Sequence, residues 1–247
     1  VQQMKNFDSR LVQIPIQNGN PAAKADWREF PIPFDNEARE ACVVSGEDGL
    51  IWYVNDYSKA GLQAFDPREE TWIEMPPVES AESYFSILKL KEGSILAGSM
   101  GGLLHRSVSG KRTFYSHVEL GLPRVPLSLF EADDGRVWVM GRIGYVHSVD
   151  LGHEEWATYP GLNFQCETEE GVQWFRSLSL QHVVSYDPRS REWLRYGRED
   201  HLIDEVLLLL HSSHGLIWGA GIHDGRAAIV VFDGTKWTRY LHPEFAH

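Results

Sequence analysis

The sequence is poor in cysteine and in positive charge, and it lacks any long hydrophobic run. Two cysteines among 247 residues are too few for a disulfide framework. Lys and Arg total 23 against 35 Asp and Glu, so the formal net charge is −12. Such an acidic surface repels a phosphate backbone, which argues against nucleic acid as a partner. No apolar run approaches the roughly 18 residues of a membrane-spanning helix, so no membrane-spanning segment is predicted.

Tryptophan, in contrast, is abundant and regularly placed. Every one of the nine tryptophans belongs to one of two series. In the first series the tryptophan follows a glycine by three residues, and its members are Trp52, Trp138, Trp174 and Trp218. In a fifth copy of this motif, Leu96 stands in place of the tryptophan. The glycines of these copies are 36 to 44 residues apart. The second series is Trp27, Trp72, Trp156, Trp193 and Trp237.

Each copy predicts four short strands. An apolar stretch leads to an acidic turn ending in glycine, such as Asp133–Gly135, and then to the first-series tryptophan. A third strand ends in an apolar or aromatic residue and Asp, and a last strand holds the second tryptophan. No helical periodicity lasts 11 residues, so the chain is predicted to be all-β. Four strands in about 42 residues are typical of a β-propeller blade, with the tryptophans packed between neighbouring sheets.

Five repeats are complete and predict the limits of five blades. These blades are residues 37–76, 80–118, 122–160, 162–197 and 202–241. Residues 10–30 look like the third and fourth strands of another unit, so we expect a single domain over residues 1–247 with an extra N-terminal strand pair. The alternative is part of a six- or seven-bladed ring, whose open edges would favour association. Cys42 and Cys166 lie in equivalent places of two separate repeats, which predicts two buried thiols without a bridge.

The repeat also resembles a known family. The motif runs from Glu-Asp-Gly-Leu-Ile-Trp at 47–52 through Phe-Asp-Pro at 65–67, and ends as Trp-Leu-Arg-Tyr at 193–196. It is similar to the two-component regulator propeller repeat of bacterial histidine kinase sensor regions, and to the repeat of streptogramin (virginiamycin B) lyase, over residues 24–241. The resemblance implies a propeller fold, a bacterial origin, and a surface for small molecules, glycans or proteins. It suggests an extracytoplasmic location and leaves a cytoplasmic one open.

The candidate ligand site follows from propeller geometry. Ligands meet the face built by the turns between second and third strands and by the crossings between blades. Five arginines fall there: Arg39, Arg124, Arg142, Arg176 and Arg226. Guanidinium groups suit carboxylates or phosphates. The remaining candidates are Tyr57, Tyr84 and Phe164 as stacking surfaces for sugars, and His201 and His223, each beside an aspartate. In the alternative interpretation, the arginines form ion pairs with acids of the same loops: Asp56, Glu82, Asp204 and Asp224.

Catalytic motifs are missing from the sequence. It has no Gly-x-Ser-x-Gly elbow and no phosphate-binding loop, and the pair His211 and His214 has no third ligand nearby. The lyase family places histidine at the starts of inner strands, where none occurs here, so its residues do not carry over. We therefore predict no catalytic residue, metal or cofactor. The predicted function is a non-catalytic binding or sensor module for a small anionic molecule or glycan. The alternatives are a scaffold for another protein or domain, and a metal-dependent lyase.

Overall fold

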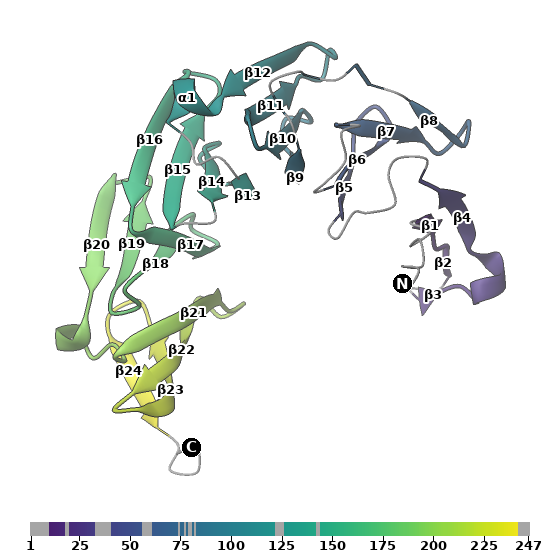
Figure 1. Ribbon diagram of the computed structural model, residues 1–247. Helices are drawn as coiled ribbons and strands as arrows, with labels where there is room; N and C mark the ends of the chain where they lie inside the picture. The colour runs from purple at the N-terminus through teal and green to yellow at the C-terminus, as the bar shows by residue number, and fades with distance from the viewer. Residues whose placement is uncertain are drawn as a thin grey trace, which may run out of the picture. The chain divides into compact units, whose positions relative to one another are not determined.

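The protein is described here from a computed structural model. It covers residues 10–17, 20–32, 41–55, 61–73, 75–76, 78, 81, 83–121, 126–141 and 144–241. The chain divides into two compact units, Val1–Leu120 (unit 1) and Gly121–His247 (unit 2), which are described separately (Figure 1). The expectation of one domain over residues 1–247 stays a prediction.

Unit 1 contains two four-stranded antiparallel sheets, each made of consecutive strands. The first consists of β5 (Ala41–Ser45), β6 (Ile51–Asn55), β7 (Gln63–Asp66) and β8 (Thr71–Ile73). The second consists of β9 (Tyr84–Lys89), β10 (Ile95–Ser99), β11 (Gly102–Arg106) and β12 (Arg112–Ser116), followed by the short helix α1 (His117–Leu120).

The N-terminal strand pair is present, as the sequence predicts. β1 (Arg10–Gln13) pairs with β4 (Arg28–Pro31), and between them lie β2 (Ile16–Gln17), β3 (Asn20–Pro21) and the 3-10 turn η1 (Lys24–Asp26). Phe30 contacts Phe65 with ring centroids 4.8 Å apart, and Trp72 Nε1 donates to the carbonyl oxygen of Pro31 at 2.9 Å. The pair therefore packs against the first sheet of unit 1.

Unit 2 contains three more sheets of the same kind. The first consists of β13 (Pro126–Glu131), β14 (Val137–Gly141), β15 (Tyr145–Asp150) and β16 (Glu155–Pro160). The second consists of β17 (Leu162–Glu167), β18 (Gln173–Ser177), β19 (Val183–Asp187) and β20 (Glu192–Tyr196), and the 3-10 turn η2 (Arg198–Asp200) follows it. The third consists of β21 (Glu205–His211), β22 (Ile217–His223), β23 (Arg226–Phe232) and β24 (Trp237–Leu241). The chain is thus an all-β protein of five propeller-type blades plus an N-terminal strand pair.

The strand order fixes which loops share an end of each sheet. Because consecutive strands are antiparallel, the turn between the second and third strands lies at the end where the first strand starts and the fourth finishes. We call this end, where the chain crosses to the next sheet, the crossing end. The other end carries the first-to-second and third-to-fourth turns, and we call it the hairpin end.

The first-series tryptophans form the cores between consecutive sheets. Trp52, Trp138 and Trp174 are each at most 3% exposed and pack against side chains of the following sheet. Trp174, for example, lies 5.3 Å from Phe232 and 5.8 Å from Trp237, measured between ring centroids. Acidic turns ending in glycine precede these strands, and the positive φ of +83° at Gly135 is one that residues with a Cβ rarely adopt.

The expectation that all nine tryptophans are packing residues is too broad. Trp218 is 40% exposed on the last sheet, which no further sheet follows among the described residues. Trp156 and Trp193 are 40% and 37% exposed, since each lies on a fourth strand at the outer edge of its sheet.

Two further sequence predictions concern membranes and cysteines. Among the described residues, no helix is both long and apolar enough to cross a bilayer. Neither cysteine forms a disulfide, as expected, although both side chains are half-buried instead of fully buried. Burial raises the pKa of the Cys166 thiol to about 11, which keeps it protonated at neutral pH.

Candidate functional site

The crossing end of unit 2 brings the best-defined polar cluster of the described residues together. Its members come from η2, from the loop that leads into β21, and from the turn between β22 and β23. The central residue is His223, the last residue of β22, whose side chain is only 6% exposed.

Charged side chains flank the His223 ring on both sides. Its Nε2 lies 3.3 Å from Nη1 of Arg239 and 3.7 Å from Oδ2 of Asp224, and its Nδ1 lies 3.2 Å from Oδ1 of Asp204. The ring is therefore held between one guanidinium and two carboxylates.

Asp204 is stabilised in its charged form. Its Oδ2 accepts a 2.8 Å hydrogen bond from the backbone N–H of Asp224. This bond, followed by the nearby His223 and the Arg198 guanidinium, holds the pKa of Asp204 below its usual value despite the opposing effect of burial. Arg198 reaches both acids, at 3.4 Å from Asp204 Oδ1 and 3.3 Å from Asp224 Oδ1.

Arg239, on β24, hydrogen-bonds to the backbone of the segment that crosses from β20 to β21. Its Nε donates to the carbonyl oxygen of His201 at 2.7 Å, and its Nη2 donates to those of Arg198 at 3.0 Å and Leu202 at 2.8 Å. These carbonyls belong to the segment that leaves β20 and enters β21. The guanidinium therefore ties the last strand of the sheet to the chain that enters it.

The same cluster has the spacing of a metal site. Asp204, His223 and Asp224 offer ligand atoms within 4.8 Å of one another, and no other such group occurs in the described part of the chain. However, the Arg198 guanidinium faces both carboxylates and Arg239 faces Nε2. A cation would have to displace two positive groups, so the residues fit an ion-pair network and do not fit a metal.

A polar cavity of about 260 Å³ adjoins this cluster. Six residues line it: Gln181, His182, Arg198, Glu199, Ile203 and Asp204. Its wall carries one guanidinium and two carboxylates, and His182 Nε2 lies 2.5 Å from Nη2 of Arg195. The cavity is thus a small site rich in hydrogen-bonding groups, at the end of the sheets where the sequence predicts a ligand.

The structure places six of the ten predicted site residues. The other four, Arg39, Tyr57, Arg124 and Arg142, lie outside the described residues. Tyr84 and Phe164 are 2% and 8% exposed and pack in the cores of their units. Burial raises the pKa of Tyr84 to about 12. The prediction that these two rings offer a stacking surface is corrected, because strand alternation turns them inward.

The remaining four predicted residues lie at the crossing end of unit 2. His223 is buried in the cluster, and His201 is an exposed residue with φ of +66° that ends η2. Arg176 is half-buried and its Nε has no hydrogen-bond partner, while Arg226 is exposed. The acids that the alternative interpretation pairs with them, Asp204 and Asp224, bind Arg198 instead.

Sequence reasoning missed Arg198 and Arg239. Arg239 stands two residues after Trp237, inside the Trp-x-x-Tyr motif, where Arg195 and Thr158 occupy the same place in the two preceding repeats. Position in the repeat alone does not distinguish an arginine that binds backbone carbonyl oxygens from an exposed arginine.

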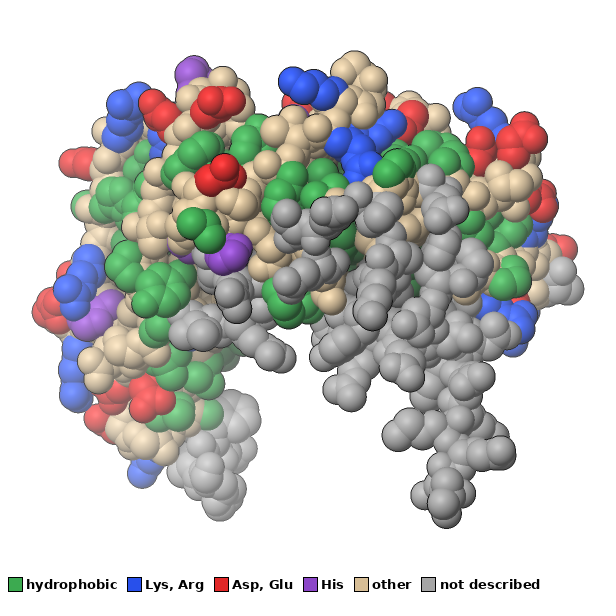
Figure 2. All heavy atoms as spheres, turned by 45° about the horizontal axis from the view of Figure 1, so that its top comes forward, with side chains coloured by type: hydrophobic (Ala, Val, Ile, Leu, Met, Phe, Trp, Pro, Cys, Tyr) green, Lys and Arg blue, Asp and Glu red, His purple; other side chains and the backbone are tan. Residues whose placement is uncertain are grey.

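On the face drawn in Figure 2, basic and acidic side chains are interspersed, so the excess of acid forms no single patch there.

Comparisons with known proteins bear on the fold. No protein-family model and no curated protein sequence matches the chain. Among solved structures, virginiamycin B lyase from Staphylococcus aureus matches with a TM-score of 0.57 and 14% identity, over 88% of this chain and 74% of that chain. YCF48 bound to D1 peptide matches with a TM-score of 0.61 and 17% identity, over 98% of this chain and 77% of that one.

A third solved structure is an extracellular domain. It is the extracellular domain of BT3049 from B. thetaiotaomicron, described as a hybrid two component system, with a TM-score of 0.59 and 14% identity. It covers 91% of this chain, which spans only 31% of the length of that domain. The fold is therefore that of the β-propellers found in streptogramin lyases and in two-component sensor regions, as the repeat predicts.

Proposed function

We propose that this chain is a non-catalytic, ligand-binding propeller module of the sensor type, which recognises a small anionic molecule or glycan at the crossing end of its sheets. One observation carries the proposal. Arg176 and Arg226 lie at that end without an acidic partner among the described residues, whereas Arg198 and Arg239 are engaged. An uncompensated guanidinium with fixed donors is suited to a carboxylate or phosphate of a ligand.

The surroundings of these arginines support a small ligand. The cavity of about 260 Å³ at the same end, which is lined by Arg198 and Asp204 and not by these two arginines, has the size of a small metabolite or a single sugar, and its polar wall supplies donors and acceptors. The folds of lyases and of extracellular sensor domains are both compatible with such a site. The absence of histidine at the first residue of β5, β9, β13, β17 and β21 favours binding over lyase chemistry.

The test is a thermal-shift panel of citrate, inorganic phosphate, glucuronate and neutral maltose. The wild-type chain is compared with Arg176→Ala/Arg226→Ala and with a charge-matched control, Arg68→Ala/Arg189→Ala, whose residues lie at hairpin ends. A ligand at 100 times its Kd adds about 2.7 kcal/mol of stability, which a melting curve resolves easily. An anion should stabilise the wild type and the control but not the first variant. Equal shifts in all three proteins would contradict the proposal.

An alternative, a protein-binding module, is favoured by a different feature. One face of the last sheet exposes Leu208, Leu210, Trp218, Ile229 and Tyr240, each between 40% and 61%. In the earlier sheets of unit 2 this face is covered by the next sheet, so its natural occupant is another four-stranded sheet of this repeat type. A panel in which no small molecule raises the melting temperature would favour this alternative.

A further inference from the structure

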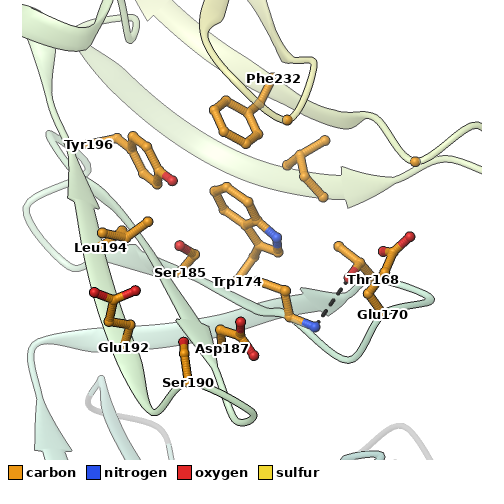
Figure 3. A pocket seen from close by; sticks show the side chains of 14 residues that line it. Thr168, Glu170, Trp174, Ser185, Asp187, Ser190, Glu192, Leu194, Tyr196 and Phe232 are labelled. Atoms are coloured by element: carbon orange, nitrogen blue, oxygen red, sulfur yellow. Dashed lines mark hydrogen bonds between the residues drawn. The ribbon is translucent and has the colours of Figure 1, made fainter.

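A second groove lies at the hairpin end of unit 2, away from the crossing-end cluster. It runs between the sheets β17–β20 and β21–β24 and has a volume of about 290 Å³ (Figure 3). Its floor is aromatic: the Trp174 and Tyr196 rings are stacked at 5.6 Å, and Phe232 lies 5.3 Å from Tyr196. Its rim carries the carboxylates of Glu170, Asp187 and Glu192, and no Lys, Arg or His is among the residues that line it.

An equivalent groove one sheet earlier contains its own cation. Four of its lining residues hold the repeat positions of Ser185, Asp187, Glu192 and Tyr196, namely Ser148, Asp150, Glu155 and Tyr159. There the Arg136 guanidinium lines a smaller space, of about 190 Å³. It donates to the Tyr186 hydroxyl at 3.2 Å, lies 5.8 Å from the Tyr186 ring centroid and pairs with Asp134 at 3.5 Å.

One difference between the two turns removes the guanidinium from the open groove. Arg136 follows Gly135 and stands two residues before Trp138. The residue in the same place of the next repeat is Val172, after Gly171 and two residues before Trp174. Val172 lines the open groove, so a neutral side chain stands where the preceding sheet supplies a guanidinium.

In unit 1 a guanidinium also lies against a first-series tryptophan, but it comes from a third strand and not from the turn before the tryptophan. Arg106 lies 4.4 Å from the Trp52 ring and pairs with Asp48 at 3.3 Å. Its place on the third strand, opposite Ile95, corresponds to that of Phe232, opposite Ile217. In each unit, therefore, an arginine of the chain itself pairs with the acid of the turn and lies against an aromatic ring at this repeat position, whereas the groove beside Trp174 has no such arginine among its lining residues.

A buried donor without a partner also belongs to the lining of the open groove. The Nε1 atom of Trp174 is buried without a hydrogen-bond partner, although the residue lines the groove. Figure 3 shows the ring nitrogen on the side that faces Thr168. Of the equivalent atoms, that of Trp52 donates to Asp48 Oδ1 at 3.4 Å, and that of Trp138 is likewise buried without a partner. A ligand that brings both a cation and a carbonyl acceptor would satisfy the carboxylates and this donor together.

We infer that the groove between β17–β20 and β21–β24 binds an arginine residue of a peptide, with its guanidinium among Glu170, Asp187 and Glu192 over the aromatic floor. A planar guanidinium both stacks on aromatic rings and donates in a fork to carboxylates, which a compact ammonium does less well. Arg136 and Arg106 make part of these contacts from within the chain, since each pairs with the turn acid equivalent to Glu170 and lies near an aromatic ring.

The test is calorimetric titration of the whole chain with Nα-acetyl-L-arginine N-methylamide. Its citrulline counterpart has almost the same shape but no charge, so it is the matched control ligand. We expect saturable binding of the arginine derivative and at least about tenfold weaker binding of the citrulline derivative, because charge-assisted hydrogen bonds are lost. No saturable binding at millimolar concentrations, or equal binding of both compounds, would overturn the inference.

Variants then locate the site. Val172→Arg should place a guanidinium in the groove from within, as Arg136 does, and abolish binding with an unchanged far-ultraviolet circular dichroism spectrum. Glu170→Gln/Glu192→Gln changes only exposed rim residues and should weaken binding at least about tenfold. The control Glu169→Gln/Glu154→Gln carries the same charge change at residues that do not line the groove and should bind as the wild type does. Undiminished binding by the rim variant refutes the site even if Val172→Arg fails to fold.

Discussion

Trp138 and Trp218 hold the same position in their repeats and lie in opposite environments. Each follows a glycine by three residues on the second strand of a sheet in unit 2. Trp138 is fully buried, with its ring 5.0 Å from Phe175 of the next sheet, whereas Trp218 is 40% exposed. The repeat position therefore sets the face toward which a side chain points, but only a neighbouring sheet buries it.

The largest expected effect tests this contrast directly. Trp138→Ala should destabilise the protein by about 3–5 kcal/mol, because it leaves a large cavity between two packed sheets. Trp218→Ala should cost clearly less, since the ring is already 40% exposed and no following sheet packs on it among the described residues. Urea unfolding followed by far-ultraviolet circular dichroism measures both free energies. Equal costs for the two variants would mean that the face of Trp218 is covered in solution.

The second prediction compares two arginines at the crossing end of unit 2. Arg239→Met should cost about 2 kcal/mol of unfolding free energy, because the carbonyl oxygens that it holds lose their donor. Arg226→Met removes an exposed side chain and should change stability by less than about 0.5 kcal/mol. The same unfolding experiment measures both. A similar cost for Arg226→Met would show that it too is structural, which would remove it from the proposed ligand site.

The smallest effect concerns two histidines on the first sheet of unit 2. Burial lowers the pKa of His147 below its usual 6.5, whereas a hydrogen bond from its side chain to Asp150 raises the pKa of the exposed His153. Because the pKa of His147 is lower in the folded than in the unfolded chain, protonation favours the unfolded chain. His147 therefore lowers the free energy of unfolding as the pH falls from about 7 to 5. His153 has the opposite sign: its contribution is present at low pH and is lost as the pH rises through its raised pKa.

Thermal unfolding across this pH range separates the two histidines. His147→Asn should reduce the loss of stability on acidification, while His153→Ala should remove a contribution that is present only in acid. If His147→Asn leaves the pH profile unchanged, His147 does not control the acid response.

Much of the fold is predictable from the sequence because each blade is local. Strand, acidic turn, tryptophan strand and outer strand follow one another within each repeat, so glycine spacing alone indicates four-stranded sheets. The strands β17–β20, for example, run from Leu162 to Tyr196 within the repeat at 162–197. Burial depends on which sheets stack, and this is why the prediction holds for Trp174 and is wrong for Trp218.

The candidate site is predictable only in outline. The rule that second-to-third turns and crossings share an end correctly places Arg176, His201, His223 and Arg226 at the crossing end. It does not show that Arg239 holds three carbonyl oxygens, or that Tyr84 and Phe164 turn inward, because these depend on side-chain direction and on chain segments distant in sequence.

The amino-acid sequence by itself determines the blade repeat, the all-β class and the acidic character of this protein. These follow from local turn chemistry, the alternation of apolar residues and composition. Only the tertiary structure decides which arginines are engaged and which groove is left without a cation. Arg136 and Val172 differ by one side chain at one repeat position, but the consequence appears only where two sheets meet, since the carboxylates and aromatic rings of the groove come from strands far apart in the chain.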